Sequence, residues 1–164
     1  INRHPHIFPN NKNNNFIDID NWELAKQKEK KRTSILEGVP KALPSLTRAR
    51  RIQEKAASVG FDWAKIQQVY NKVSEEIDEL KSAIQKENIA NISEELGDVL
   101  FTIVNLSRHI NINPEIALNK STNKFIKRFK KMESHMNKNK LDFKTQSVSQ
   151  LDKIWNKIKK SNSE

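Results

Sequence analysis

Two neighbouring stretches of this chain, residues 64–85 and 91–111, repeat apolar side chains at intervals of three and four positions. An α-helix turns once in about 3.6 residues, so each stretch predicts a long helix with one apolar face, and we expect these faces to be buried in the core. The polar segment between them, Lys86 to Asn91, suits a turn, and the two helices should form an antiparallel hairpin. The apolar positions are Ile66, Val69, Tyr70, Val73, Ile77, Leu80 and Ile84 in the first stretch, and Ile92, Leu96, Val99, Leu100, Ile103, Leu106 and Ile110 in the second.

The remainder of the chain also favours helices. Its 164 residues include only three Gly and five Pro, and no valine-rich alternating run indicates a strand. We therefore predict an all-α fold, a helical bundle with the hairpin at its centre. The other expected features are a short helix at 22–32, a helix from Pro44 to Val59 with Gly60 as its left-handed cap, Asn91 as the cap of the second hairpin helix, a helix from Pro114 to Met136, and a last helix after a capping sequence at 147–150.

The composition excludes several classes of protein. The chain has no cysteine, so it holds no disulfide framework, thiolate zinc site or thiol nucleophile. It has no run of about 18 apolar residues that would span a membrane, and no charged start followed by an apolar run that would direct secretion. We expect a cytoplasmic protein without a membrane partner.

The start of the chain differs from the rest. Residues 1–20 contain two prolines and an asparagine-rich segment, and they are too polar to form a core. We assign them to a linker or the tail of a preceding domain, residues 21–160 to the main domain, and residues 161–164 to a short C-terminal tail. Because the first residue is isoleucine, we expect the sequence to begin inside a longer or processed product.

Charge is distributed unevenly along the chain. The net charge is +10, which invites a nucleic-acid partner, although a lysine-rich composition also explains much of the excess. Residues 70–98 carry eight acidic residues against three lysines, whereas residues 120–164 carry thirteen basic residues against four acidic ones. The hairpin is therefore acidic and the C-terminal quarter is basic.

Two clusters of carboxylates, at residues 75–79 and 94–98, lie on the two hairpin helices. Their positions are symmetric about residue 87, which sets Glu76 opposite Asp98 and Glu79 opposite Glu95 in an antiparallel pair. At about 100° per residue, these four side chains also lie on the facing flanks of the two helices, whereas the other carboxylates point elsewhere. We predict that the four converge.

Converging carboxylates repel one another, and a bound cation relieves that repulsion at neutral pH. Oxygen ligands without cysteine or a nearby histidine suit Mg²⁺ or Mn²⁺, and Ca²⁺ is less easily excluded. Mg²⁺ commonly binds substrate phosphates as well. The competing interpretation is a solvated acidic face paired with Lys72, Lys81 and Lys86. Gly97 lies in the middle of a helix, where glycine is unfavourable, which indicates that another backbone packs closely there. A second subunit is one candidate for that neighbour.

At these residues the chain resembles the MazG family of nucleoside triphosphate pyrophosphohydrolases, whose acidic pattern is EExxE, a spacer, then EExxD. The similarity extends over roughly residues 22–160. The opening segment, Arg3 to Phe8, looks like the junction that follows the first of two tandem domains in longer members, so the resemblance implies a C-terminal domain. Further matching segments are Leu43 to Leu46, RARRIQEKAASVGFDW at 48–63, EELGDVLFTIVNLSRH at 94–109 and NKFIKRF at 123–129.

The resemblance implies an all-α, Mg²⁺-dependent enzyme, a homodimer or higher homo-oligomer, that hydrolyses nucleoside triphosphates to the monophosphate and pyrophosphate. Mn²⁺ is the alternative ion. The metal ligands and catalytic carboxylates it implies are Glu76, Glu79, Glu95 and Asp98. The implied mechanism is metal-assisted attack of water on the phosphate chain, with one carboxylate as the candidate base.

The resemblance also implies substrate-binding residues outside the acidic clusters. Lys124 and Arg128 lie one helical turn apart and match phosphate-binding positions, although they also suit an exposed basic face. Trp155 is a candidate contact for the nucleobase or, equally, a core anchor. Lys55 is a candidate phosphate neighbour or a surface lysine. Asn91 stands where some relatives carry a basic residue, which puts one phosphate contact in doubt.

Two functions from different classes remain at this point. The first is a nucleoside triphosphate pyrophosphohydrolase that removes surplus or non-canonical nucleotides. The second is a basic helical module, a catalytically decayed relative that binds nucleic acid or has a regulatory role. The acidic hairpin favours the first, so we expect no nucleic-acid partner.

Overall fold

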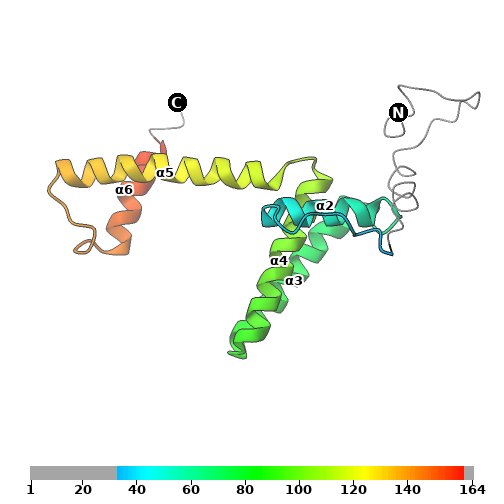
Figure 1. Cartoon of the computed structure of the whole chain (residues 1–164). Helices are drawn as coiled ribbons and strands as arrows, with labels where there is room; N and C mark the ends of the chain where they lie inside the picture. Colours follow the sequence, from blue (N-terminus) through cyan, green and yellow to red (C-terminus); the bar gives the residue numbers. More distant parts are fainter. Residues whose placement is uncertain (1–32, 161–164) are drawn as a thin grey trace, which may run out of the picture. The chain divides into compact units, whose positions relative to one another are not determined.

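A computed structural model of the chain describes residues 33–160 (Figure 1). The described part contains helices and no strand, which confirms the predicted all-α class. The predicted helix at 22–32 and the two terminal segments, 1–20 and 161–164, lie outside the described residues. Within 33–160, no helix is both long and apolar enough to cross a lipid bilayer. The helices are α2 (Ser45–Ala57), α3 (Ile66–Gln85), α4 (Ile89–His109), α5 (Pro114–Lys138) and α6 (Val148–Lys160).

The chain divides into two compact units, one that ends at Pro114 and one that begins at Glu115. The first contains α2, α3 and α4, and the second contains nearly all of α5 together with α6.

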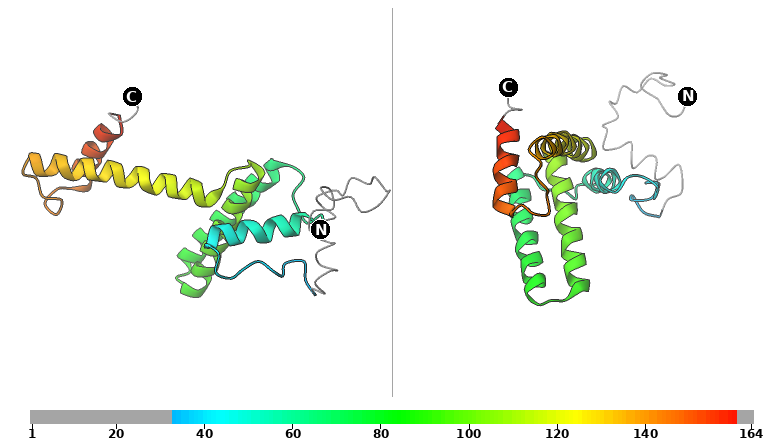
Figure 2. Two further views of the ribbon diagram at one scale, coloured as in Figure 1. Left: turned by 45° about the horizontal axis from the view of Figure 1, so that its top comes forward. Right: turned by 90° about the vertical axis from the view of Figure 1, so that its left-hand side faces the viewer.

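Helices α3 and α4 form the predicted hairpin and run side by side in opposite directions (Figures 1 and 2). The chain reverses at Glu87, the predicted centre of symmetry, where the backbone takes a left-handed conformation with φ of 53°. Asn88 caps α4, because its side chain accepts a hydrogen bond from the backbone N–H of Asn91 at 3.3 Å. The prediction that Asn91 is the cap was therefore wrong by one turn of the helix.

Helix α2 packs against α4 and covers part of the hairpin. Pro44 occupies the N-cap position of α2, and Gly60 has the expected left-handed backbone, with φ of 87°. The buried side chain of Gln53 donates a hydrogen bond from Nε2 to the backbone oxygen of Phe101, at 2.8 Å. Arg50 donates to the backbone oxygen of Ile112 at 2.7 Å, so α2 is fixed both to the middle of α4 and to the segment that follows α4.

An ion cluster ties the loop before α3 to the last turn of α4. Arg108 donates to both carboxylate oxygens of Asp62, and the Nη1 to Oδ2 distance is 2.9 Å. Arg108 also donates to Asn105, and His109 Nε2 lies 3.1 Å from Asp62 Oδ1. Partial burial opposes ionisation of Asp62, but the hydrogen bond and charge of Arg108 outweigh it and lower the pKa of Asp62.

The second unit has a small core of its own. Met132, Met136 and Ile158 are buried between α5 and α6. Ser147 begins α6 with the predicted capping box, in which the Ser147 N–H donates to the Gln150 side chain at 2.8 Å and the Gln150 N–H donates to Ser147 Oγ at 3.3 Å. Partly buried residues around this core are Leu141, Phe143, Leu151, Ile154 and Trp155.

Much of the apolar face of the hairpin is exposed, which corrects the expectation of a buried stripe on α4. Val69 and Val104 are buried, but Leu100 keeps 51% of its surface and Ile84 keeps 53%. The reason is geometric, since the apolar stripes are wider than the surface that the facing helix and α2 cover. The half-exposed positions of the two predicted stripes are Ile66, Tyr70, Ile77, Ile84, Leu96, Leu100, Ile103 and Ile110.

The Asp62–Arg108 pair predicts a pH-dependent loss of stability. A carboxyl whose pKa is lowered by folding stabilises the protein above its ordinary value, here 3.8, and this contribution disappears as the pH falls through the lowered value. Replacing Asp62 with Asn should reduce the free energy of unfolding at pH 7 by about 1–2 kcal/mol. Chemical denaturation at several pH values measures the difference, which should shrink below pH 3.8.

The matched control is Asp78→Asn, because Asp78 forms an exposed ion pair with Lys81 and should contribute little. If Asp62→Asn and Asp78→Asn have the same effect at pH 7, the ion cluster does not stabilise the fold as described.

Candidate metal centre

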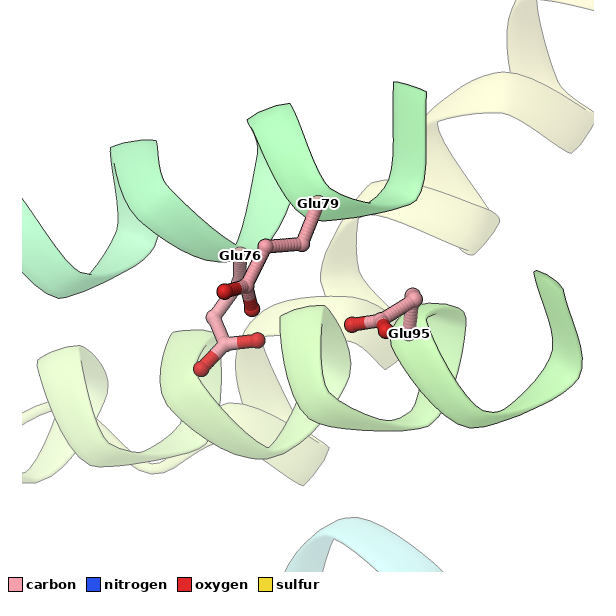
Figure 3. Close-up of side chains that lie close together, drawn as sticks. All are labelled: Glu76, Glu79 and Glu95. Carbon is pink, nitrogen blue, oxygen red and sulfur yellow. The ribbon is translucent and has the colours of Figure 1, made fainter. Parts of the chain in front are cut away.

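Three carboxylate side chains from the two hairpin helices lie close together. Glu76 and Glu79 come from successive turns of α3, and Glu95 comes from the first half of α4. Each of them offers an oxygen, and these oxygens all lie within 4.8 Å of one another. Figure 3 shows the three side chains turned toward a common space between the helices. The convergence predicted from helical geometry is therefore present for these three residues.

Glu76 is the most enclosed of the three, with 5% of its surface exposed. Its Oε1 accepts a hydrogen bond from Lys72 Nζ at 2.8 Å. Its Oε2 is buried and has no hydrogen-bond partner among the described residues. A buried carboxylate oxygen without a partner is costly, and a cation beside this atom would offset that cost.

The surroundings of Glu95 raise its pKa. Desolvation raises the pKa of Glu95, and the charges of Glu79, Asp98, Glu76 and Glu94 raise it further. Glu95 therefore keeps its proton to a higher pH than an ordinary glutamate does. Binding of a divalent cation would offset the part of this shift that comes from the neighbouring charges.

Asp98 lies three residues beyond Glu95 on α4 but does not join the group of three. It is close enough for its charge to raise the pKa of Glu95. The structure thus places the fourth predicted ligand beside the cluster rather than within it.

The donor set fits a small divalent cation. All of the converging atoms are carboxylate oxygens, which hard cations such as Mg²⁺ and Mn²⁺ prefer. Since the unpartnered oxygen of Glu76 is already buried, an ion placed among the three carboxylates would supply its missing interaction.

The competing interpretation, a solvated acidic face paired with lysines, holds for part of α3. Lys81 pairs with Asp78 at 2.8 Å on the exposed face, as expected for a solvated pair. Lys72 differs, because it contacts the buried Glu76 as well as Glu75, and hydrogen bonding to Glu76 raises the pKa of Lys72. Sequence reasoning treated the two lysines alike, and only the burial of Glu76 separates them.

Comparison with known proteins identifies the segment that carries these carboxylates. Residues 65–133 match the family model described as the MazG nucleotide pyrophosphohydrolase domain. The chain belongs to the MazG family. The matched residues include all four predicted acidic ligands together with Lys124 and Arg128, whereas Lys55 and Trp155 lie outside them.

Curated relatives extend the similarity over nearly the whole chain. A Thermotoga maritima protein named nucleoside triphosphate pyrophosphohydrolase/pyrophosphatase MazG is 44% identical over 97% of this chain and 61% of its own length. The Escherichia coli nucleoside triphosphate pyrophosphohydrolase is 37% identical over 96% of this chain and 62% of its own length. An uncharacterized Bacillus subtilis protein is 38% identical over 98% of this chain and 34% of its own length. The chain thus spans about three fifths of the two named enzymes.

The remaining candidate residues of this MazG chain lie in different surroundings. Lys55, on α2, has 6% of its surface exposed, so its interpretation as a surface lysine was wrong. Lys124 and Arg128 follow each other by one turn on α5. Trp155, on α6, joins the core of the second unit, and its ring centroid lies 5.3 Å from that of Phe125. A core role for Trp155 is therefore present, and contact with a nucleobase stays a prediction.

Gly97 has open space around it within the described residues. A Cβ added to it would meet no atom within 4 Å. The predicted close approach of another backbone is therefore not made by the described part of this chain, and approach by a second subunit stays a prediction.

The carboxylate cluster predicts that metal-free protein gains stability when one charge is removed. Because the pKa of Glu95 is raised on folding, the folded state binds more protons than the unfolded state, and stability falls as the pH rises from the ordinary value of 4.5. Glu95→Gln should therefore unfold at a higher temperature than the wild type at pH 7 in a metal chelator. Calorimetry over pH 4–8 measures the difference, which should close as the pH falls.

The control is Glu94→Gln, since Glu94 makes the smallest contribution to the shift of Glu95. A wild type that is as stable as Glu95→Gln at every pH would show that the carboxylates do not repel one another strongly.

Proposed function

We propose that this chain hydrolyses nucleoside triphosphates to the monophosphate and pyrophosphate in a reaction that requires Mg²⁺, with Mn²⁺ as an alternative ion. The observation that carries the proposal is the convergence of Glu76, Glu79 and Glu95 within a segment of the MazG domain. The names of the Thermotoga maritima and Escherichia coli relatives support this choice of reaction. Because its substrates are cytoplasmic nucleotides, we expect the protein in the cytoplasm.

The acidic residues have distinct tasks in this proposal. Glu76, Glu79 and Glu95 hold the cation, and Asp98, next to the cluster, completes its ligands or those of a second ion. A divalent cation held by these carboxylates would neutralise charge on the phosphate oxygens and would make the attacking water easier to deprotonate. A carboxylate of the cluster accepts the proton of the attacking water.

Basic residues supply the complementary contacts to the substrate. Lys124 and Arg128 project from one face of α5, which suits two contacts to a triphosphate. Lys55 and Trp155 are the further proposed contacts, to phosphate and to the base. The basic C-terminal segment then serves anion binding rather than nucleic-acid binding.

Substitution of the acidic residues tests the proposed activity. Glu76→Gln and Asp98→Asn should each lower pyrophosphate release from a mixture of nucleoside triphosphates with Mg²⁺ by at least about tenfold. Loss of a residue that orients a metal ligand commonly lowers activity by about this factor, and loss of a ligand itself should lower it at least as much. A coupled pyrophosphate assay measures the rate. The control is Asp78→Asn, on the same helix and paired only with Lys81 at the surface, which should keep the wild-type rate.

An unchanged rate in both variants would contradict the proposal. Wild-type protein that releases no pyrophosphate, yet binds RNA or DNA with a steep dependence on salt, would favour the nucleic-acid-binding or regulatory alternative.

We also propose that two or more copies of the chain assemble through the exposed apolar face of the hairpin. Leu96, Leu100 and Ile103 form a half-exposed apolar row on α4. Apolar patches of this kind are uncommon on monomers. Gly97 follows Leu96 on the neighbouring face of the helix, and a Cβ added to it would meet no described atom within 4 Å, so the backbone there is open to close packing. A second copy of this hairpin would cover both features.

Light scattering coupled to size-exclusion chromatography tests the assembly. Wild-type protein should have at least twice the mass of one chain, and Leu100→Glu should shift it toward the monomer, because a charge buried in an apolar interface is costly. The control is Val148→Glu, which replaces an exposed apolar residue at the start of α6. Wild-type protein with the mass of a single chain at micromolar concentration would contradict the assembly.

A further inference from the structure

Lys72 holds one oxygen of the most buried carboxylate in the cluster. It lies one turn before Glu76 on α3, and its Nζ is 2.8 Å from Glu76 Oε1 and 2.9 Å from Glu75 Oε1. Glu75 is largely exposed, whereas the side chain of Glu76 keeps only 7% of its surface. Lys72 is thus fixed between an outer carboxylate and an inner one.

The contact divides the two oxygens of Glu76 between two partners. Oε1 accepts the hydrogen bond from Lys72, while the buried Oε2 has no partner within residues 33–160. A cation that took both oxygens would have to share Oε1 with the ammonium group, and the two positive charges would repel. While Lys72 stays in place, Glu76 therefore offers a cation one oxygen.

The number of oxygens that a carboxylate offers affects which ion a site prefers. Ca²⁺ takes about six to eight oxygens and often binds both oxygens of one carboxylate, whereas Mg²⁺ takes about six at shorter distance. A glutamate restricted to one oxygen therefore disfavours Ca²⁺ more than Mg²⁺. Groups that hydrogen-bond to a metal ligand commonly tune metal binding in this way.

We propose that Lys72 is a positioning residue that restricts Glu76 to one-oxygen binding, and that it thereby makes the cluster prefer Mg²⁺ and Mn²⁺ over Ca²⁺. This inference rests on the proposed metal site of the previous subsection. It assigns Lys72 a role in ion selectivity, separate from any contact with substrate.

The ratio of two affinities is the informative quantity. Removing the charge of Lys72 should strengthen binding of every divalent cation by a similar factor, because Mg²⁺ and Ca²⁺ carry the same charge. That effect cancels in the ratio of the Ca²⁺ to the Mg²⁺ association constant. A change in the ratio therefore reports on the oxygens that Glu76 offers and not on overall electrostatics.

Isothermal titration calorimetry of the full chain with Mg²⁺, Mn²⁺ and Ca²⁺, without nucleotide, tests the proposal. Lys72→Met should raise the Ca²⁺ to Mg²⁺ ratio by about tenfold or more relative to the wild type. Lys72→Arg keeps a donor and should leave the ratio near the wild-type value. Lys81→Met, which removes the same charge from an exposed pair on the same helix, should also leave it unchanged.

An unchanged ratio in Lys72→Met would overturn the role of Lys72. Should Lys72→Met fail to fold by thermal unfolding, Lys72→Ala lacks the same donor and is judged by the same ratio. Failure of the underlying metal site is a different result: wild-type protein would then bind none of the three ions, or Glu76→Gln would bind them as tightly as the wild type does.

Discussion

The packing of α3 against α4 places the carboxylates of Glu76, Glu79 and Glu95 between the two helices (Figure 3). Helices in contact have axes about 8–10 Å apart, a separation that glutamate side chains bridge from both sides. Apolar contacts at buried positions such as Val69 and Val104 favour this packing. Repulsion among Glu76, Glu79 and Glu95 opposes it. Desolvation is the largest cause of the raised pKa of Glu95, and this repulsion raises the pKa further. A bound cation would turn this opposing interaction into a favourable one, so metal binding and hairpin stability are coupled in our account.

Local features of the fold could be predicted because they depend on neighbours in sequence. The apolar intervals identified the helices, and the symmetry of the acidic clusters located the reversal at Glu87 and the meeting of Glu79 with Glu95. Features that depend on long-range contacts could not be predicted in this way. The ion pair between Asp62 and Arg108 joins residues 46 positions apart, and no pattern in the sequence between them indicates it.

Side-chain burial was also beyond the sequence. Periodicity shows which face of a helix is apolar but not how much of it a single chain covers, so the half-exposed Leu100 was expected to be buried. The same limit hid the difference between Lys72 and Lys81, which have similar spacing from an acidic residue. The Lys72–Glu76 pair belongs to the proposed site because Glu76 is buried, whereas the Lys81–Asp78 pair is exposed. The metal-binding and catalytic roles of the four acidic residues remain predictions, whereas the family is established.

The central claim is that the carboxylates between α3 and α4 hold a divalent cation. Anomalous diffraction from crystals grown with Mn²⁺ tests it most directly, because the anomalous signal locates the ion itself. The account predicts a peak bounded by carboxylate oxygens of Glu76, Glu79 and Glu95. A fully formed hairpin with no anomalous peak in this space, at Mn²⁺ concentrations that support pyrophosphate release, would contradict it.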